Sequence, residues 1–167
     1  MPAFSIDRLA ADEWQRCRAV RLRALEDTPD AFGSTLEEEL RLTDAEWQDR
    51  LTRSDVATFV ARSLGPTDIG LAVGAPYDDV AGLYSMWVAP TARGNGVGGA
   101  LISAVNEWAI ETGHQKILLD VGDHNAAAIA LYESKGFVRT GITGTHPPPR
   151  EDITEHQRVL LLTSATV

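Results

Sequence analysis

Apolar residues alternate with polar ones, or run together, in seven short segments of the chain. Such segments, bounded by turn-forming residues, are typical of β-strands. In the segment KILLDV the apolar positions share one face, which puts Asp120 on the opposite face. The expected strands are Phe4–Leu9, Val56–Ala61, Ile69–Gly74, Val80–Ala89, Lys116–Val121, Phe137–Ile142 and His156–Thr163.

Helices are expected in four other segments of the chain. A helical spacing of apolar residues is clearest after residue 96, where Val97, Leu101, Val105 and Trp108 fall on one stripe of an amphipathic helix that ends at Gly113. The expected helices are Ala11–Glu26, Ser34–Arg53, Val97–Thr112 and Asn125–Lys135, the last closed by Gly136.

The order of these segments predicts the architecture. Three closely spaced strands between residues 56 and 89 are expected to pair antiparallel. Two strand–loop–helix–strand units follow, over residues 80–121 and 116–142, each short enough for a right-handed crossover. The sequence therefore predicts one α/β domain over residues 1–167, with a mixed sheet, antiparallel in its first half, and helices on both faces.

The composition of the chain limits the classes of partner that it can bind. The net charge of −9 argues against nucleic acid or an anionic membrane as a partner. It would attract a cationic acceptor, but an acidic surface that only keeps the protein soluble explains the charge at least as well. Cys17 is the single cysteine, which excludes intramolecular disulfides and a cysteine-based metal cluster. The first residues lack the basic start and apolar stretch of a signal peptide, so we expect a cytoplasmic protein.

The stretch RGNGVGGA, residues 93–100, is the first candidate for chemistry, because a glycine-rich loop before a helix is typical of phosphate binding. Gly94, Gly96 and Gly99 match a dinucleotide fingerprint, with Asp120 as the ribose-binding acid. However, five residues separate Val88 from Gly94, and too little chain follows for the second half of a dinucleotide fold.

A coenzyme A thioester uses the same glycines differently. The backbone N–H groups of Asn95–Gly99 would donate hydrogen bonds to a pyrophosphate at the helix N-terminus, and Arg93 would add charge-assisted hydrogen bonds. A β-carbon at Gly96 or Gly98 would obstruct the close approach of the phosphate to the backbone.

Two segments together carry a family resemblance. Arg93-x-x-Gly96-x-Gly98 resembles the (Gln/Arg)-x-x-Gly-x-(Gly/Ala) signature of the GCN5-related N-acetyltransferases (GNAT). The later segment LLDVGDHNAAAIALYESKGFVRTG is similar to the second signature of that family, an Asn, an alanine-rich helix, Leu-Tyr and Gly-Phe. The resemblance implies a mostly antiparallel sheet of about seven strands, acetyl-CoA as co-substrate and no metal.

The resemblance also implies roles for individual residues. The strand before the glycine loop would bind pantetheine through its exposed backbone, and Asn125 would bind the pantetheine arm, although an Asn at a helix start is equally an ordinary N-cap. The implied cofactor residues are Met86, Trp87, Val88, Arg93, Gly94, Asn95, Gly96, Val97, Gly98, Gly99 and Asn125.

For catalysis the resemblance implies that Tyr132 protonates the departing thiolate, a task that suits a neutral phenol. Asp120 stands where some members have a catalytic glutamate, but it is one methylene shorter, so a base and a purely structural role remain equally open. His124, His146 and His156 lie in or beside expected loops or exposed strand ends and rank below Asp120. Glu37–Glu39 correspond to a wall of the acceptor pocket, with a solvated helix face as the favoured alternative.

These observations lead to an expected function. The chain is expected to be an acetyl-CoA-dependent N-acetyltransferase that acts on a primary amine of a small molecule or peptide by direct attack. The alternatives are a catalytically weak acyl-CoA-binding sensor and an acyltransferase that uses another acyl-CoA. The resemblance leaves a homodimer open.

Overall fold

The computed structural model describes residues 3–163 as a seven-stranded sheet with helices on both faces. The spatial order of the strands is β1-β2-β3-β4-β5-β7-β6; only β4 and β5 pair in parallel, and every other neighbouring pair is antiparallel. The predicted fold class and strand number are therefore confirmed. The strands are β1 (Phe4–Arg8), β2 (Ala57–Ser63), β3 (Asp68–Tyr77), β4 (Val80–Val88), β5 (Lys116–Gly122), β6 (Val138–Thr145) and β7 (Thr154–Leu161).

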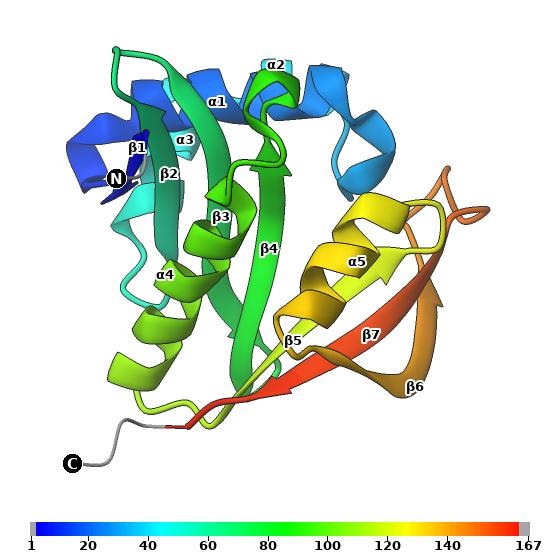
Figure 1. Cartoon of the computed structure of the whole chain (residues 1–167). Helices are drawn as coiled ribbons and strands as arrows, with labels where there is room; N and C mark the ends of the chain where they lie inside the picture. Colours follow the sequence, from blue (N-terminus) through cyan, green and yellow to red (C-terminus); the bar gives the residue numbers. More distant parts are fainter. Residues whose placement is uncertain (1–2, 164–167) are drawn as a thin grey trace.

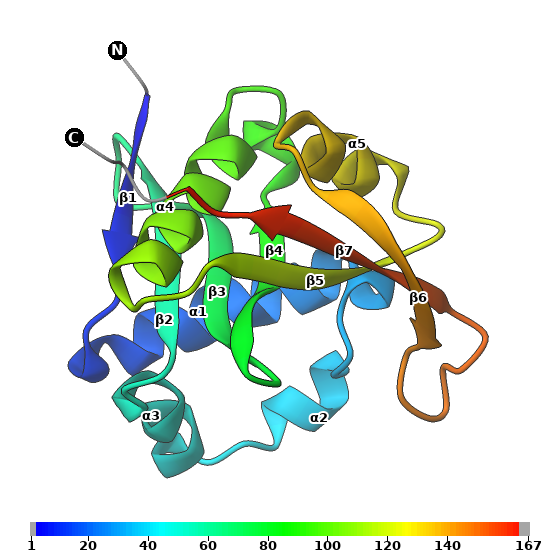
Figure 2. The same cartoon turned by 90° about the horizontal axis from the view of Figure 1, so that it is seen from below.

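The helices divide between the two faces of the sheet. Figures 1 and 2 show α1, α2 and α3 on one face and α4 and α5 on the other. The helices are α1 (Trp14–Asp27), α2 (Leu36–Leu40), α3 (Asp44–Thr52), α4 (Val97–Glu111) and α5 (Ala126–Ser134), with short 3₁₀ turns η1 (Ala11–Glu13), η2 (Pro29–Ala31) and η3 (Pro90–Ala92).

Strands β4 and β5 separate along their length. They pair only at Ala81–Ile117 and Gly82–Leu118. Beyond Gly82 the two strands diverge, as Figure 1 shows, and α5 lies over β5 and β7. The second half of β4 is therefore paired with β3 on one side and has an open backbone edge on the other.

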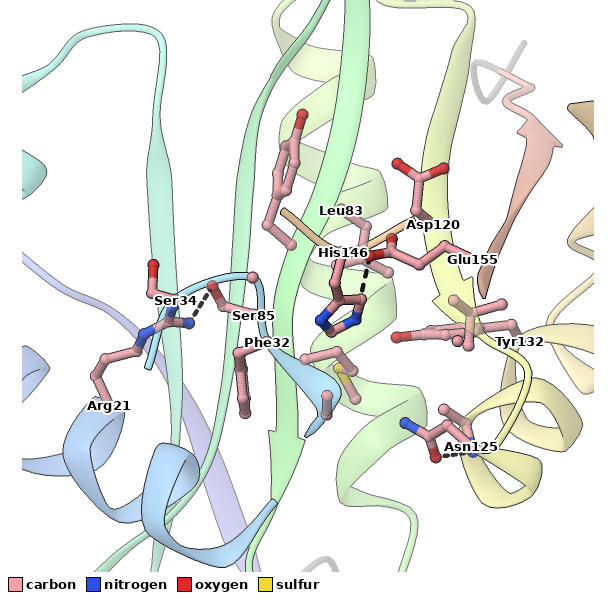
Figure 3. Close-up of a pocket in the computed structure, with 17 residues that line it drawn as sticks. Arg21, Phe32, Ser34, Leu83, Ser85, Asp120, Asn125, Tyr132, His146 and Glu155 are labelled. Atoms are coloured by element: carbon pink, nitrogen blue, oxygen red, sulfur yellow. Dashed lines mark hydrogen bonds and ion pairs between the residues drawn. The ribbon is translucent and has the colours of Figure 1, made fainter. Parts of the chain in front are cut away.

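A β-bulge interrupts β4 where this divergence begins. Ser85 has a positive φ of 59°, and the register with β3 shifts between Leu71 and Val73. Arg21 of α1 donates from Nη1 to Ser85 Oγ over 2.7 Å, a bond drawn in Figure 3. A bulge re-aims the side chains that follow it, so α1 takes part in setting the direction of the second half of β4.

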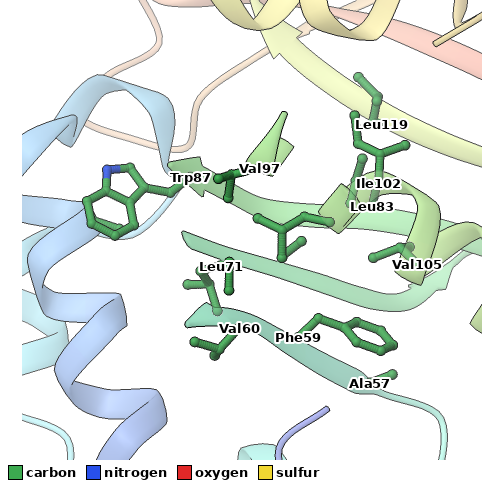
Figure 4. Close-up of a cluster of buried hydrophobic side chains, with 14 of the residues drawn as sticks. Ala57, Phe59, Val60, Leu71, Leu83, Trp87, Val97, Ile102, Val105 and Leu119 are labelled. Carbon is green, nitrogen blue, oxygen red and sulfur yellow. The ribbon is translucent and has the colours of Figure 1, made fainter. Parts of the chain in front are cut away.

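The core lies between the sheet and α4 and continues to α1 on the other face. Strand β2 is buried at five successive positions, Ala57–Ala61, because helices cover both faces of the central strands. From α4, the predicted stripe of Val97, Leu101, Val105 and Trp108 packs onto β2, β3 and β4, in part as Figure 4 shows. The helix prediction for this segment is confirmed.

One helix prediction was wrong. The single helix expected over Ser34–Arg53 is two helices, separated at Arg41–Thr43. Thr43 accepts a hydrogen bond from the Glu46 backbone N–H, and Glu46 bonds the Thr43 N–H in return. This capping box starts a new helix, and its Thr-x-x-Glu pattern is readable in the sequence.

Candidate active site

The N-terminal end of α4 opens into a groove between β4 and α5. Gly96 is the N-cap, in the left-handed conformation (φ 84°), and no side chain caps the helix. The first N–H groups of a helix have no partner within it. The groove has a volume of about 390 Å³. It is lined by every predicted cofactor residue except Asn95, namely Met86, Trp87, Val88, Arg93, Gly94, Gly96, Val97, Gly98, Gly99 and Asn125.

The positions of Gly96, Gly98 and Gly99 require glycine for different structural reasons. A β-carbon at Gly96 would meet nothing within 4 Å, so this position needs glycine for its backbone angle. A β-carbon at Gly98 would lie 2.8 Å from Leu131 Cδ2, and one at Gly99 would lie 2.9 Å from Lys135 Nζ. Gly98 therefore allows α5 to pack against α4, and Gly99 makes room for Lys135.

Lys135 is a residue that the sequence interpretation missed. Its ammonium lies beside the N-terminal turn of α4, and it forms no ion pair with any residue that the structure describes. The helix end and the lysine together make this end of the groove suitable for an anion. No motif marks a lysine at the far end of the next helix, so only the packing of α5 reveals it.

Arg93 stands at the rim of the same groove. Its guanidinium donates to the Asp27 carboxylate over 2.6 Å and to the Val88 carbonyl over 3.0 Å. Asp27 also accepts from the Trp87 indole over 3.0 Å. A contact between Arg93 and a pyrophosphate, as the sequence predicts, requires these bonds to be shared or exchanged.

The open edge of β4 runs along the groove. The Ala89 N–H donates to the Ile69 carbonyl of β3 over 2.8 Å. Since the backbone groups of a strand alternate in direction, those of Val88 point to the opposite side, away from β3. The backbone groups of Trp87 point to β3, and the Trp87 side chain is in the core. Met86 is half-buried and faces the groove.

Asn125 is placed for both of the roles that the sequence left open. Its Oδ1 accepts from the Ala128 N–H over 3.2 Å, so it is the N-cap of α5. The residue also lines the groove, and Figure 3 shows its amide nitrogen directed away from the helix. The cap uses the oxygen and leaves the amide donors available to a ligand.

A second cavity, of about 280 Å³, adjoins the groove; Met86, Asn125 and Ala128 line both. Tyr132 is buried, packs edge-on against Phe137 at 5.8 Å between ring centres, and points its hydroxyl into this cavity (Figure 3). Burial raises the pKa of Tyr132. The phenol is therefore a neutral proton donor over the whole physiological range.

Asp120 lines the same cavity from β5 and is exposed. The Tyr77 hydroxyl donates to its carboxylate, at 2.8 Å from Oδ2, and accepts from the Gln157 amide over 3.1 Å. Burial raises the pKa of Tyr77, and although the hydrogen bond from Gln157 lowers it, the carboxylate of Asp120 raises it further. The structure thus brings Asp120 and Tyr132 to one cavity and holds Asp120 in a side-chain network.

Two side chains expected to be solvated are buried. His146 lies in the loop between β6 and β7, as expected, but it is 3 % exposed and lines the cavity, and its Nε2 lies 3.1 Å from Glu155 Oε1. Glu39, expected on a solvated face, is 2 % exposed and pairs with Arg21 and Arg50. The three partners belong to other elements than the residues that they contact, which is why spacing did not reveal the pairs.

Among residues 3–163, no helix is both long and apolar enough to cross a membrane. Within the same described range, no group of three or more His, Cys, Asp or Glu side chains is arranged to hold a metal ion.

An open strand edge, a bare helix N-terminus and a buried phenol thus lie over two adjoining cavities. A family model described as the acetyltransferase (GNAT) family matches residues 14–137. The chain belongs to this family.

Curated relatives carry acetyltransferase names. The chain is 36% identical over 102 residues to an IAA acetyltransferase of Azospirillum brasilense, covering 59% of this chain and 65% of that protein. It is 32% identical over 141 residues to a mycothiol acetyltransferase of Nocardiopsis dassonvillei, covering 80% of this chain and 42% of that protein. The chain thus spans less than two thirds of the length of these relatives.

Solved structures show the same fold over nearly the whole chain. A GCN5-related N-acetyltransferase from Kribbella flavida superposes with a TM-score of 0.75 at 25% identity, covering 96% of this chain and 98% of that one. The ribosomal-protein-S18-alanine N-acetyltransferase from Escherichia coli superposes with a TM-score of 0.70 at 21% identity, covering 98% and 96%. At that identity the second similarity shows the fold alone.

Proposed function

We propose that the protein is an acetyl-CoA-dependent N-acetyltransferase that transfers the acetyl group to a primary amine of a small molecule or peptide. The observation that carries the proposal is the groove at the N-terminus of α4, which gathers the predicted cofactor residues beside the open edge of β4. The names of the relatives and the family support the same reaction type.

The residues of the groove fit coenzyme A in kind. The uncapped N-terminus of α4 and the ammonium of Lys135 suit a pyrophosphate. The open edge of β4 and the amide of Asn125 suit the amides of a pantetheine arm, which can pair with a free strand edge. When bound, acetyl-CoA supplies the thioester carbon that the amine attacks.

The protein contributes position, charge and protons to this reaction. Tyr132 donates its proton to the departing sulfur, because a phenol with a raised pKa remains protonated at neutral pH. Asp120 attracts and orients the cationic acceptor. The Val88 N–H, at the open edge, stabilises the charge that develops on the thioester oxygen.

Calorimetric titration with acetyl-CoA, followed by an assay of thiol release with a panel of amines, tests this function. The panel contains an amino acid, a polyamine, an amine-bearing antibiotic and a peptide with a free N-terminus. We expect acetyl-CoA to bind and one class of amine to raise thiol release above the rate with water. Binding without any amine-dependent release would favour an acyl-CoA sensor, and tighter binding of another acyl-CoA would change the donor. Absence of binding contradicts the proposal.

Replacing Gly96 with Ala tests the helix N-terminus. Both Gly96 and Gly113 have positive φ angles, at opposite ends of the α4 segment, with nothing within 4 Å of a β-carbon. Alanine at either site therefore carries a similar strain of about 1–2 kcal/mol. We expect only Gly96→Ala to weaken acetyl-CoA binding, by about tenfold, or about 1.4 kcal/mol. Calorimetry on the two variants checks this, and equal affinities would exclude a role for the Gly96 turn.

A further inference from the structure

His146 is held firmly over the second cavity although it belongs to a loop. Its backbone N–H donates to the Ile153 carbonyl over 3.0 Å, closing the loop between β6 and β7. Arg150 of that loop donates to the carbonyls of Pro29 over 2.7 Å and Phe32 over 2.6 Å. These bonds fasten the loop to the segment after α1, so the imidazole has a fixed place between the two walls of the cavity.

The two ring nitrogens of His146 have different surroundings. Nε2 lies 3.1 Å from Glu155 Oε1, and Nδ1 is buried without a hydrogen-bond partner among the described residues. If Nε2 carries the proton and donates it to the Glu155 carboxylate, Nδ1 has a free lone pair. An unpartnered buried nitrogen is costly in a folded protein and calls for a reason.

The cavity supplies that reason. His146 and Tyr132 both line it, and Figure 3 shows the imidazole and the phenol hydroxyl entering the same space from opposite sides of the divergence between β4 and β5. Nδ1 is closed to solvent, so an amine in this space reaches it only after a neighbouring side chain shifts, and it then brings the N–H donor that Nδ1 lacks. Asp120 is differently placed, since its carboxylate is exposed and already accepts from Tyr77.

We infer that His146, oriented by Glu155, is the general base that accepts a proton from the acceptor amine through Nδ1; this rests on the proposed function. Asp120 then acts on the charge of the acceptor rather than as its base. The arrangement of carboxylate, imidazole and attacking group follows the logic of other activated nucleophiles.

The proton balance of the step closes. The acceptor arrives as an ammonium ion and first releases one proton to solvent. The neutral amine nitrogen then bonds the thioester carbon and becomes acidic, and one of its protons passes to His146 Nδ1. The carbon–sulfur bond breaks, and the sulfur takes the proton of Tyr132. The imidazolium, stabilised by Glu155, returns a proton to the phenolate through solvent. The products are an amide and a thiol, and both side chains regain their starting states.

The surroundings of the imidazole favour its neutral form. Burial lowers the pKa of His146, and Arg150 and His124 lower it further, while Asp30 and Asp152 raise it. Burial raises the pKa of Glu155, and Asp120 adds to this, while His124 lowers it. The other titratable groups that line the cavity are Arg21, Tyr84 and Tyr132. The acidic limb of the activity profile is therefore expected below about pH 6.5, the ordinary pKa of a histidine.

His146→Asn and Glu155→Gln test the inference, with His156→Asn as the matched control. His156 also pairs with a carboxylate, that of Asp123, and neighbours Glu155 on β7, but it does not line the cavity. Thiol release is measured against pH with the most active amine of the panel and with water as the acceptor. Calorimetry with acetyl-CoA shows whether each variant retains its fold.

For His146→Asn we expect kcat/KM for the amine to fall about 100-fold at pH 7, with the acidic limb lost and acetyl-CoA affinity within about twofold of the parent. For Glu155→Gln the expected fall is about tenfold, and for His156→Asn less than about twofold. An unchanged profile in His146→Asn overturns the inference but not the proposed function. Failure of the parent protein to bind acetyl-CoA overturns the proposed function as well.

If His146→Asn does not fold, an NMR measurement on the parent protein, made without an acceptor amine, still tests the inference. In the parent protein labelled with ¹⁵N-histidine, we expect the NMR spectrum at pH 7 to show one buried imidazole protonated at Nε2 and bare at Nδ1. Glu155→Gln assigns that signal by shifting it. A proton found on Nδ1 instead overturns the inference.

Discussion

Replacing Tyr132 with Phe is expected to lower kcat by about 1,000-fold while leaving acetyl-CoA affinity nearly unchanged. The phenol ring is buried against Phe137, and its hydroxyl is the part that faces the cavity. Phenylalanine retains the packing and removes the proton donor, so the sulfur would leave as an unprotonated thiolate. Steady-state rates and calorimetry of the same preparation separate the two effects.

Tyr84→Phe is the control for this change. The Tyr84 hydroxyl donates to the Pro76 carbonyl over 2.8 Å and is not needed for proton transfer. We expect its kcat to remain within about twofold of the parent. If Tyr132→Phe and Tyr84→Phe turn over equally fast, the proton reaches the sulfur by another route and the assignment of Tyr132 is wrong.

Replacing Glu39 with Ala is expected to destabilise the protein by about 3 kcal/mol. Glu39 is 2 % exposed and receives three hydrogen bonds from Arg21, with Arg50 at 3.3 Å. Its removal leaves Arg21 partly buried without its counter-charge. Because Arg21 also bonds the bulge at Ser85, we expect turnover to fall together with stability.

Denaturant unfolding measures this loss, and Glu37→Ala provides the matched control. Glu37 is two positions away on α2, and its ion pair with Arg41 is exposed. Such pairs contribute little, so its midpoint should match that of the parent. Coincident midpoints for the two variants would show that the buried pair contributes nothing.

The ion pairs of Glu39 are also expected to make the stability of the protein depend on pH. Burial alone raises the pKa of this carboxyl, but the hydrogen bonds and charges of Arg21 and Arg50 bring it below its ordinary value. A lowered folded-state pKa stabilises the protein above the ordinary value near 4.5 and loses that effect as pH falls through the folded-state value. Glu39→Ala should therefore lose less stability than the parent between about pH 5 and pH 3.

Local patterns predicted most of the fold. The stripe of α4, the alternation in β5 and the glycine after α5 each depend on residues a few positions apart, and the structure confirms those elements. The helix expected over Ser34–Arg53 was wrong because its apolar spacing hides a break, which the capping box at Thr43 marks. Strand β3 extends through Pro76, since β2 pairs no further than Gly74 and requires no N–H donor there.

The sequence by itself indicated the family, most of the residues that line the groove, and Tyr132 as a candidate, because two compact motifs carry them within residues 86–141. Tertiary structure alone decided which groups face each other across the cavity. The loop of His146 reaches its place through bonds of Arg150 to carbonyls more than 110 residues earlier in the chain. Spacing along a chain carries no information about such contacts, since they form only when the sheet folds and the strands β4 and β5 diverge.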